Sequence, residues 1–171
     1  MKWRHAVPIL ALAPAMAFAQ APSDPQIAGI VVTANQIDID AGKLAKAQSK
    51  SKEVQQFAQQ MITDHTAVNK QAAALAKKLG VTPEDSDTSK ALKQAAADTA
   101  KKLKGLKGAQ FDKAYVDNEV AFHQQVLDAI DKVLVPGAKN EELKALIIKV
   151  RPAIVAHLEH AKHLQGSLPK K

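Results

Sequence analysis

Apolar residues recur every three or four positions through most of the chain, which is the spacing of one face of an α-helix. No segment alternates apolar and polar residues as a half-buried strand does. A short helix is expected between a cap at Ser86, Asp87 or Thr88 and an end near Leu103. The longer amphipathic helices are predicted over residues 25–48, 52–79, 110–134 and 141–164. The predicted fold class is therefore all-α.

Signals for helix ends set the limits of these elements. Ser23 is expected to cap the first helix, and Gly80 is expected to end the second in the left-handed conformation. Pro136 is expected to stop the fourth helix and Asn140 to cap the last. Pro152 lies inside the last helix, where its ring and its missing N–H predict a kink.

The connections predict how the helices are ordered in space. Only residues 49–51 separate the first two long helices, which predicts an antiparallel hairpin. Residues 80–108 join this hairpin to the second one, and a link of that length is able to cross a bundle. One long crossover between two helical hairpins is the ferritin-like arrangement. We therefore expect a ferritin-like four-helix bundle with a short extra helix in the crossover connection.

The start of the chain predicts export. Two basic residues precede an apolar stretch over residues 6–18, and residues 17–19 have the small-x-small pattern of a cleavage site. Residues 1–19 are expected to be a signal peptide cleaved after Ala19, and residues 20–171 a single ferritin-like helical domain in the periplasm. The apolar stretch is too short to span a bilayer, and no other segment is apolar enough to do so.

Charge and composition limit the partners. Loss of residues 1–19, which hold Lys2 and Arg4 and no acid, lowers the formal net charge from +7 to +5. The chain has no Cys, which excludes disulfides and thiolate ligands. Few aromatic residues remain for stacking on bases, so a nucleic-acid partner is not expected. The densest lysine group is either a solvated face or a weak contact for anionic envelope surfaces, and comprises Lys101, Lys102, Lys104 and Lys107.

Each long helix carries one polar residue in its apolar seam, close to mid-length. These residues are Asp38, His65, His123 and His157. An unpaired polar group in a core costs free energy, so a purely structural bundle would have an aliphatic residue at these positions. Because the midpoints of antiparallel neighbours meet, the four side chains are expected to share one layer.

One carboxylate and three imidazoles from four helices form a donor set for a single transition-metal ion, either Zn, Fe, Mn, Cu or Ni. Asp64 and Glu119 are expected behind the ligands, where they would orient the imidazoles. The alternative is a hydrogen-bonded Asp–His network without metal, which would hold the helices in register. The buried histidines are expected to titrate near neutral pH, so such a network is also open to a role as an acid sensor.

No complete catalytic set is present in the sequence. It has no Gly-x-Ser-x-Gly turn and no Gly-rich phosphate loop. Enzymatic activity therefore stays open, with a non-enzymatic protein favoured. His160 and His163 are expected to be exposed, and Tyr115 to be a core aromatic residue whose hydroxyl reaches the rim.

A set of short segments, spread over nearly all of the chain after residue 19, carries a family resemblance. The segments are Ala41-Gly42-Lys43-Leu44-Ala45, Val54-x-x-Phe57-Ala58-x-x-Met61-Ile62-x-Asp64-His65, Phe111-Asp112-x-x-Tyr115, His123 and Pro152-x-x-x-x-His157-Leu158. In this order they resemble the bacterial domain-of-unknown-function family 4142. The resemblance implies an exported helical bundle similar to ferritins, with no established biochemical function.

Two departures from related patterns bear on the site. The family usually has Glu where this chain has Asp38, and the shorter side chain weakens Asp38 as a direct ligand. Di-iron ferritin-like proteins use Glu-x-x-His pairs, and this chain has none, since Glu119 and His123 are four positions apart.

Two hypotheses follow. Either an exported bundle binds one metal ion through His65, His123 and His157, or a non-enzymatic envelope or stress-associated interaction protein has a purely structural Asp/His layer.

Overall fold

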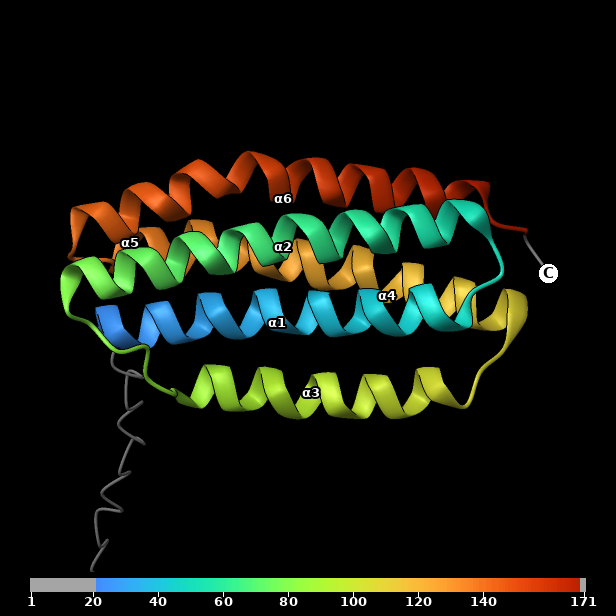
Figure 1. Ribbon diagram of the computed structural model, residues 1–171, viewed down its shortest axis with the longest axis horizontal. Coiled ribbons are helices and arrows are strands. Elements are labelled where there is room, and N and C mark those ends of the chain that lie inside the picture. Colours follow the sequence, from blue (N-terminus) through green and yellow to red (C-terminus); the bar gives the residue numbers. More distant parts are fainter. Residues whose placement is uncertain (1–20, 170–171) are drawn as a thin grey trace, which may run out of the picture.

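The computed structural model describes residues 21–169, which are all-helical and contain no strand. The predicted signal peptide, residues 1–19, lies outside the described residues. Within residues 21–169, every helix is too short or too polar to traverse a bilayer. The long helices are α1 (Asp24–Gln48), α2 (Lys52–Leu79), α3 (Asp87–Lys104), α4 (Gly108–Ala129) and α6 (Glu141–Ser167), as Figure 1 shows.

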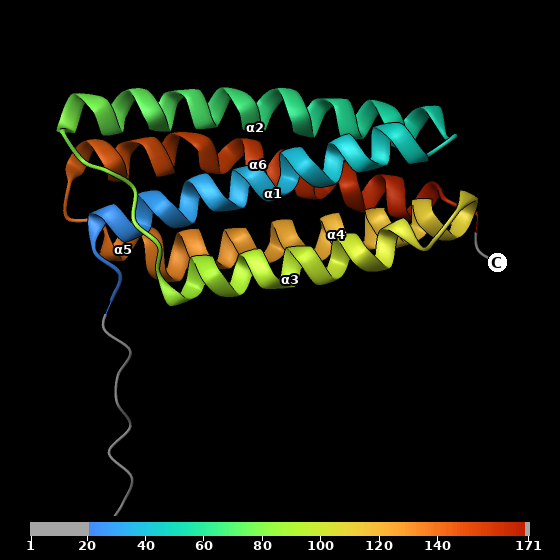
Figure 2. The ribbon, with the colours of Figure 1, turned by 60° about the horizontal axis from the view of Figure 1, so that its bottom comes forward.

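Four of these helices lie side by side around a common core (Figure 1). Going round the group, α1 packs on α2, α2 on α6, α6 on α4, and α4 on α1. The chain therefore forms the two predicted hairpins, α1–α2 and α4–α6. The helix of the crossover, α3, lies outside the four and runs along α1 and α4 (Figure 2).

The predicted helix caps are confirmed. The hydroxyl of Ser23 accepts the Gln26 N–H, and the Gln26 side chain accepts the Ser23 N–H in return. Gly80 ends α2 with φ of 64°, and Ser86 caps α3. The Asn140 side chain accepts two N–H groups from the first turn of α6. These local bonds satisfy groups that a helix end otherwise leaves without partners.

The end of the fourth predicted helix differs from the prediction. The α-helix gives way to a π-helical turn, η1 (Ile130–Leu134), and helical structure continues through the short α5 (Val135–Gly137). The Val135 N–H bonds to the Ile130 carbonyl. Pro136 has no N–H to donate within a helix, and the wider π-helical turn before it accommodates its ring. The helix therefore does not end at Leu134, where it was predicted to end.

Two apolar clusters fill the core on either side of the helix midpoints. One cluster is built around aromatic residues, including Phe57, Phe111 and Tyr115. The other is aliphatic and includes Ile27 and Ile147. Polar side chains at mid-helix are therefore enclosed by apolar residues from both directions, and this placement removes them from water.

Gly29 allows the segment before α3 to cross α1 at close range. A Cβ at this position would lie 2.0 Å from the Glu84 carbonyl oxygen, and the Glu84 N–H bonds to the Pro25 carbonyl at 2.9 Å. We expect Gly29→Ala to lower the free energy of unfolding in urea by about 1–3 kcal/mol, the cost of overpacking. Gly166→Ala is the control, because its new Cβ meets no atom within 4 Å. An equal response of the two variants would contradict this close contact.

Candidate metal centre

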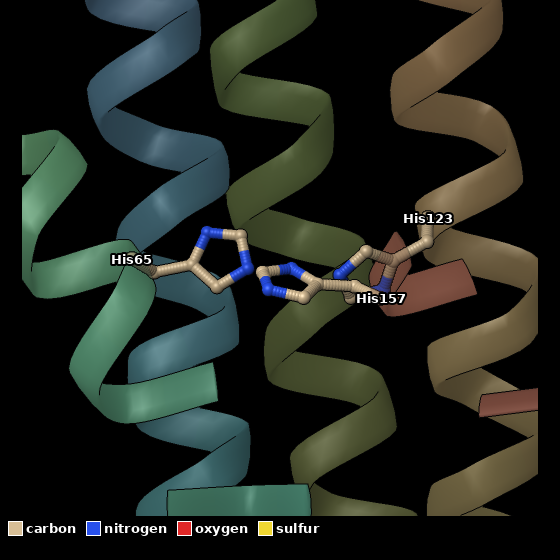
Figure 3. Close-up of side chains that lie close together, drawn as sticks. All are labelled: His65, His123 and His157. Carbon is tan, nitrogen blue, oxygen red and sulfur yellow. The ribbon is translucent and has the colours of Figure 1, made fainter. Parts of the chain in front are cut away.

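The three predicted histidines converge between α2, α4 and α6 (Figure 3). The ring centroids of His65, His123 and His157 are 5.2–5.7 Å apart. One ring nitrogen of each lies within 4.8 Å of a ring nitrogen of the other two. All three residues are at most 2% exposed. The apolar seams of α2, α4 and α6 therefore bring the three imidazoles together in the core.

One ring nitrogen of each histidine faces an oxygen that can only accept a hydrogen bond. The amide oxygen, the carbonyl oxygen and the carboxylate in these bonds place a proton on the facing nitrogen. The three pairs are His65 Nδ1 to Asn35 Oδ1 (2.7 Å), His123 Nδ1 to the Glu119 carbonyl oxygen (2.9 Å) and His157 Nε2 to Asp64 Oδ2 (2.9 Å). The Asn35 amide orientation is consistent, because its Nδ2 donates to the Val31 carbonyl at 2.8 Å.

The opposite nitrogen of each ring is free. His65 Nε2, His123 Nε2 and His157 Nδ1 are buried and have no hydrogen-bond partner within the part of the chain that the structure describes. With the proton on the other nitrogen, each of these atoms presents a lone pair. Buried polar groups in protein cores are nearly always paired, so three adjacent exceptions call for an explanation. Imidazoles that donate from one nitrogen and leave the other free are typical of metal ligands.

Two buried carboxyl groups stand beside the histidines. Asp38, Glu119 and His123 form a second group in which one ligand atom of each lies within 4.8 Å of the others. Asp38 Oδ2 is 3.4 Å from His65 Nε2, and both oxygens of Glu119 lack a partner among the described residues. Glu119, which the sequence placed behind His123, therefore lies in position to be a ligand itself. Asp38 belongs to this carboxylate group and not to the three-histidine group.

Asp64 faces His157 on α6, and not its sequence neighbour His65. Its carboxylate accepts from His157, and its side chain is 42% exposed while that of His157 is 3% exposed. The two later histidines of α6 differ from His157 in their exposure to solvent. His160 and His163 are exposed, as predicted, and His160 Nδ1 lies 3.1 Å from Gln60 Oε1. The buried layer therefore reaches solvent through Asp64.

Burial decides the protonation state of the layer. The pKa of His65 is lowered to about 3 by burial and by the neighbouring imidazoles. The pKa of His123 is lowered to about 4, mainly by burial, although its bond to the Glu119 carbonyl opposes the shift. Burial also lowers the pKa of His157, although Asp64 opposes this shift. Burial raises the pKa of Glu119 above its usual range and, with the nearby Glu119 charge, that of Asp38. At neutral pH the imidazoles are therefore neutral and able to coordinate a cation.

Two residues of this layer were not predicted correctly from the sequence. The Tyr115 hydroxyl does not reach the rim: the residue is 0% exposed and its hydroxyl has no partner among the described residues. Tyr115, Glu119 and His123 recur every four positions on α4, which turns all three toward the same interior. Asn35 was not identified, although its position three residues before Asp38 on α1 is the available signal.

The donor atoms of the two groups fit a transition metal. Neutral imidazole nitrogens and carboxyl oxygens, without sulfur, suit Zn, Fe, Mn, Cu or Ni. A tetrahedral ion about 2.0–2.1 Å from each nitrogen of the three-histidine group would bring the nitrogens to about 3.4 Å from one another. From a separation of at most 4.8 Å, the nitrogens would have to approach one another by at most about 1.4 Å.

A family model described as "Domain of unknown function (DUF4142)" matches residues 10–164. No curated protein and no solved structure gives a significant match.

Proposed function

Because the chain belongs to the family described as Domain of unknown function (DUF4142), whose description assigns no activity, we propose from its own residues that it binds one transition-metal ion. His65, His123 and His157 are the proposed ligands. The observation that carries this proposal is the set of three buried, unpartnered imidazole nitrogens, one from each ring. A carboxylate of Asp38 or Glu119 is available for the fourth position.

The residues around the proposed ligands support the same conclusion. Asn35 and Asp64 fix the rings so that the free nitrogens need no rearrangement of tautomer to coordinate. Asp38 and Glu119 supply negative charge when they lose their protons, and this charge would offset that of a dication in the core. A bound ion of this type would act as a Lewis acid toward a small ligand.

Metal stoichiometry tests the proposal directly. Protein purified without a histidine tag is stripped with a chelator and incubated separately with Zn, Fe(II), Mn, Cu and Ni. We expect at least one of these metals to remain after gel filtration at one equivalent per chain, measured by plasma mass spectrometry. Failure of every metal to reach one equivalent would exclude a resident ion.

The second candidate is a non-enzymatic interaction protein in which the layer is purely structural. The bonds from His65 on α2 to Asn35 on α1, and from His157 on α6 to Asp64 on α2, favour it. Each bond crosses between two helices, so the pair would fix the register of the helices without an ion. The two candidates differ in the effect that loss of a histidine has on metal affinity.

We further propose that the helices form a ferritin-like four-helix bundle, and that residues 20–171 act as one exported periplasmic domain. Two hairpins joined through α3 support the first proposal. The basic start, the apolar stretch and the cleavage pattern at residues 17–19 support the second. We also propose no nucleic-acid partner. N-terminal sequencing of protein recovered from a periplasmic extract is expected to begin at Gln20; a chain that still carries Met1 would contradict cleavage.

A further inference from the structure

Helix α3 is fastened to α1 at both ends. At its start, the Glu84 N–H donates to the Pro25 carbonyl at 2.9 Å. At its end, Gln48 Nε2 donates to the Leu103 carbonyl at 3.2 Å. The only residues of α3 that are fully buried are Ser89 and Leu103, which lie near these two attachments. Between these attachments the inner face of α3 is only partly buried, at Leu92, Ala96, Thr99 and Ala100.

A groove of about 1070 Å³ occupies the space that α3 leaves open. It runs between α3, α1 and α4 and is separate from the histidine layer. Its lining is mostly apolar, and the larger side chains in it are Ile37, Leu44, Leu92 and Phe122. Packed interiors rarely leave voids larger than a water molecule, whereas ligand sites are apolar hollows of roughly 300–1,000 Å³.

The dimensions of the groove limit its occupant. The lining on α3 extends from Thr88 to Lys104, which corresponds to about 24 Å along a helix axis. One acyl chain, which spans about 15 Å of the roughly 30 Å hydrocarbon core of a bilayer, fits lengthwise and leaves room for a head group.

Unpaired positive charge gathers at one end of the groove. Of the charged residues that line it, Asp40 is paired with Lys43 and Lys93 with Asp85. Lys104 also lines the groove and lies among four exposed lysines at the end of α3. The four take part in no salt bridge within residues 21–169, and are Lys101, Lys102, Lys104 and Lys107. These lysines favour an anionic head group at that end.

We propose that the groove between α3, α1 and α4 binds a free long-chain fatty acid, with the acyl chain along α3 and the carboxylate beside Lys104. The site uses none of the residues assigned to the metal centre. Fatty-acid binding and metal binding are therefore separate properties that fail or succeed independently.

Fluorescence of cis-parinaric acid tests the proposal on the protein lacking residues 1–19. We expect saturable binding of one probe per chain and displacement of the probe by palmitate. Ala96→Trp places an indole in the middle of the groove and is expected to abolish binding. Gln94→Trp is the matched control, because Gln94 is exposed on α3 and lies outside the groove lining. If circular dichroism shows that Ala96→Trp is unfolded, Ala100→Leu replaces it.

A charge variant tests the orientation of the fatty acid. Lys101→Gln with Lys104→Gln is expected to weaken palmitate binding roughly five- to tenfold, the effect of losing two exposed ion pairs. Lys70→Gln with Lys77→Gln removes the same charge from α2 and is expected to leave affinity unchanged. The proposal is overturned by an absence of saturable binding, by full binding in the folded groove-filling variant, or by equal loss in both lysine pairs. Dimers that dissociate on Ala96→Trp, without fatty-acid binding, would assign the groove to a second copy instead.

Discussion

Replacing His123 with alanine is expected to reduce the affinity of the protein for the proposed metal ion by more than about 100-fold. Loss of a group that only orients a ligand typically costs about 10- to 100-fold, and loss of a ligand costs more. His123 is the residue with the largest expected effect, because it belongs both to the three-histidine group and to the group with Asp38 and Glu119. An ion held by either group would therefore use His123.

A graded series of variants makes the measurement specific. Affinity is measured by competition with a chelator of known strength, in protein without a histidine tag. Asp64→Asn keeps the size of the side chain but removes the charge that His157 faces, so an intermediate loss of about tenfold to 100-fold is expected. His163→Ala removes an exposed imidazole from α6 and is expected to change nothing. Affinity of His123→Ala within a factor of about three of the parent protein would rule out the proposed ligand set.

Stability without metal, measured together with metal affinity, separates the two candidate functions. In the metal-free protein, His123→Leu removes a buried nitrogen that has no partner, so unfolding free energy is expected to stay level or rise. If the layer is purely structural, His123→Leu also has a small effect on stability, because the bonds between helices are made by His65 and His157, and there is no metal affinity to lose. The same variant thus has a small effect on the empty protein and a large effect on metal binding only if His123 is a ligand.

Sequence predicted the helix ends well because the interactions that set them are local. Ser23, Gly80 and Asn140 act within one turn of their own helices, so residue type and position were sufficient. The turn around Pro136 was less predictable. A helix that meets a proline either ends or widens locally to accommodate the ring, and the sequence is compatible with both. In this chain the helix widens.

The histidine layer was predictable because one polar residue in each seam marks the same depth. The full set of polar residues in the layer was not predictable. A seam drawn through one residue per turn underestimates how wide the buried face of a helix is. α1 packs against α2, α3 and α4, so its buried face is wide enough to include Asn35 as well as Asp38. On α4, the same reasoning explains why Glu119 and Tyr115 point into the layer. Which atoms approach each other across helices depends on packing that no single helix encodes.

The metal-free protein is expected to be most stable near pH 6.5 and to lose stability faster above this pH than below it. The carboxyl groups account for the alkaline side. Burial raises the pKa of Asp38 and of Glu119 in the folded protein, whereas both groups ionise near pH 4 in the unfolded chain. Above pH 6.5 the folded state therefore holds up to two extra protons. Its unfolding free energy falls by up to about 2.7 kcal/mol per pH unit until these protons are lost.

The histidines act in the opposite direction below pH 6.5. His65 and His123 have pKa values of about 3 and 4 in the folded protein, and burial also lowers the pKa of His157. The unfolded chain protonates these imidazoles near pH 6.5, so their contribution to stability declines as the pH falls below that value. The two carboxyl groups offset His65 and His123, so the acidic limb rests on the lowered pKa of His157 and is shallow.

Glu119→Gln tests this balance by removing one of the opposing groups with almost no change in shape. With one carboxyl group left, the decline in stability above pH 6.5 is expected to become about half as steep. The decline below pH 6.5 is expected to become steeper, because only one carboxyl group then offsets the histidines. Urea unfolding of metal-free protein between pH 5 and 9 measures both slopes, with the exposed Glu159→Gln as the control. If the unfolding free energies of the parent protein and of Glu119→Gln changed with pH in parallel, Glu119 would be ionised in the folded protein. A cationic group would then have to balance this carboxylate, because the three imidazoles beside it are neutral.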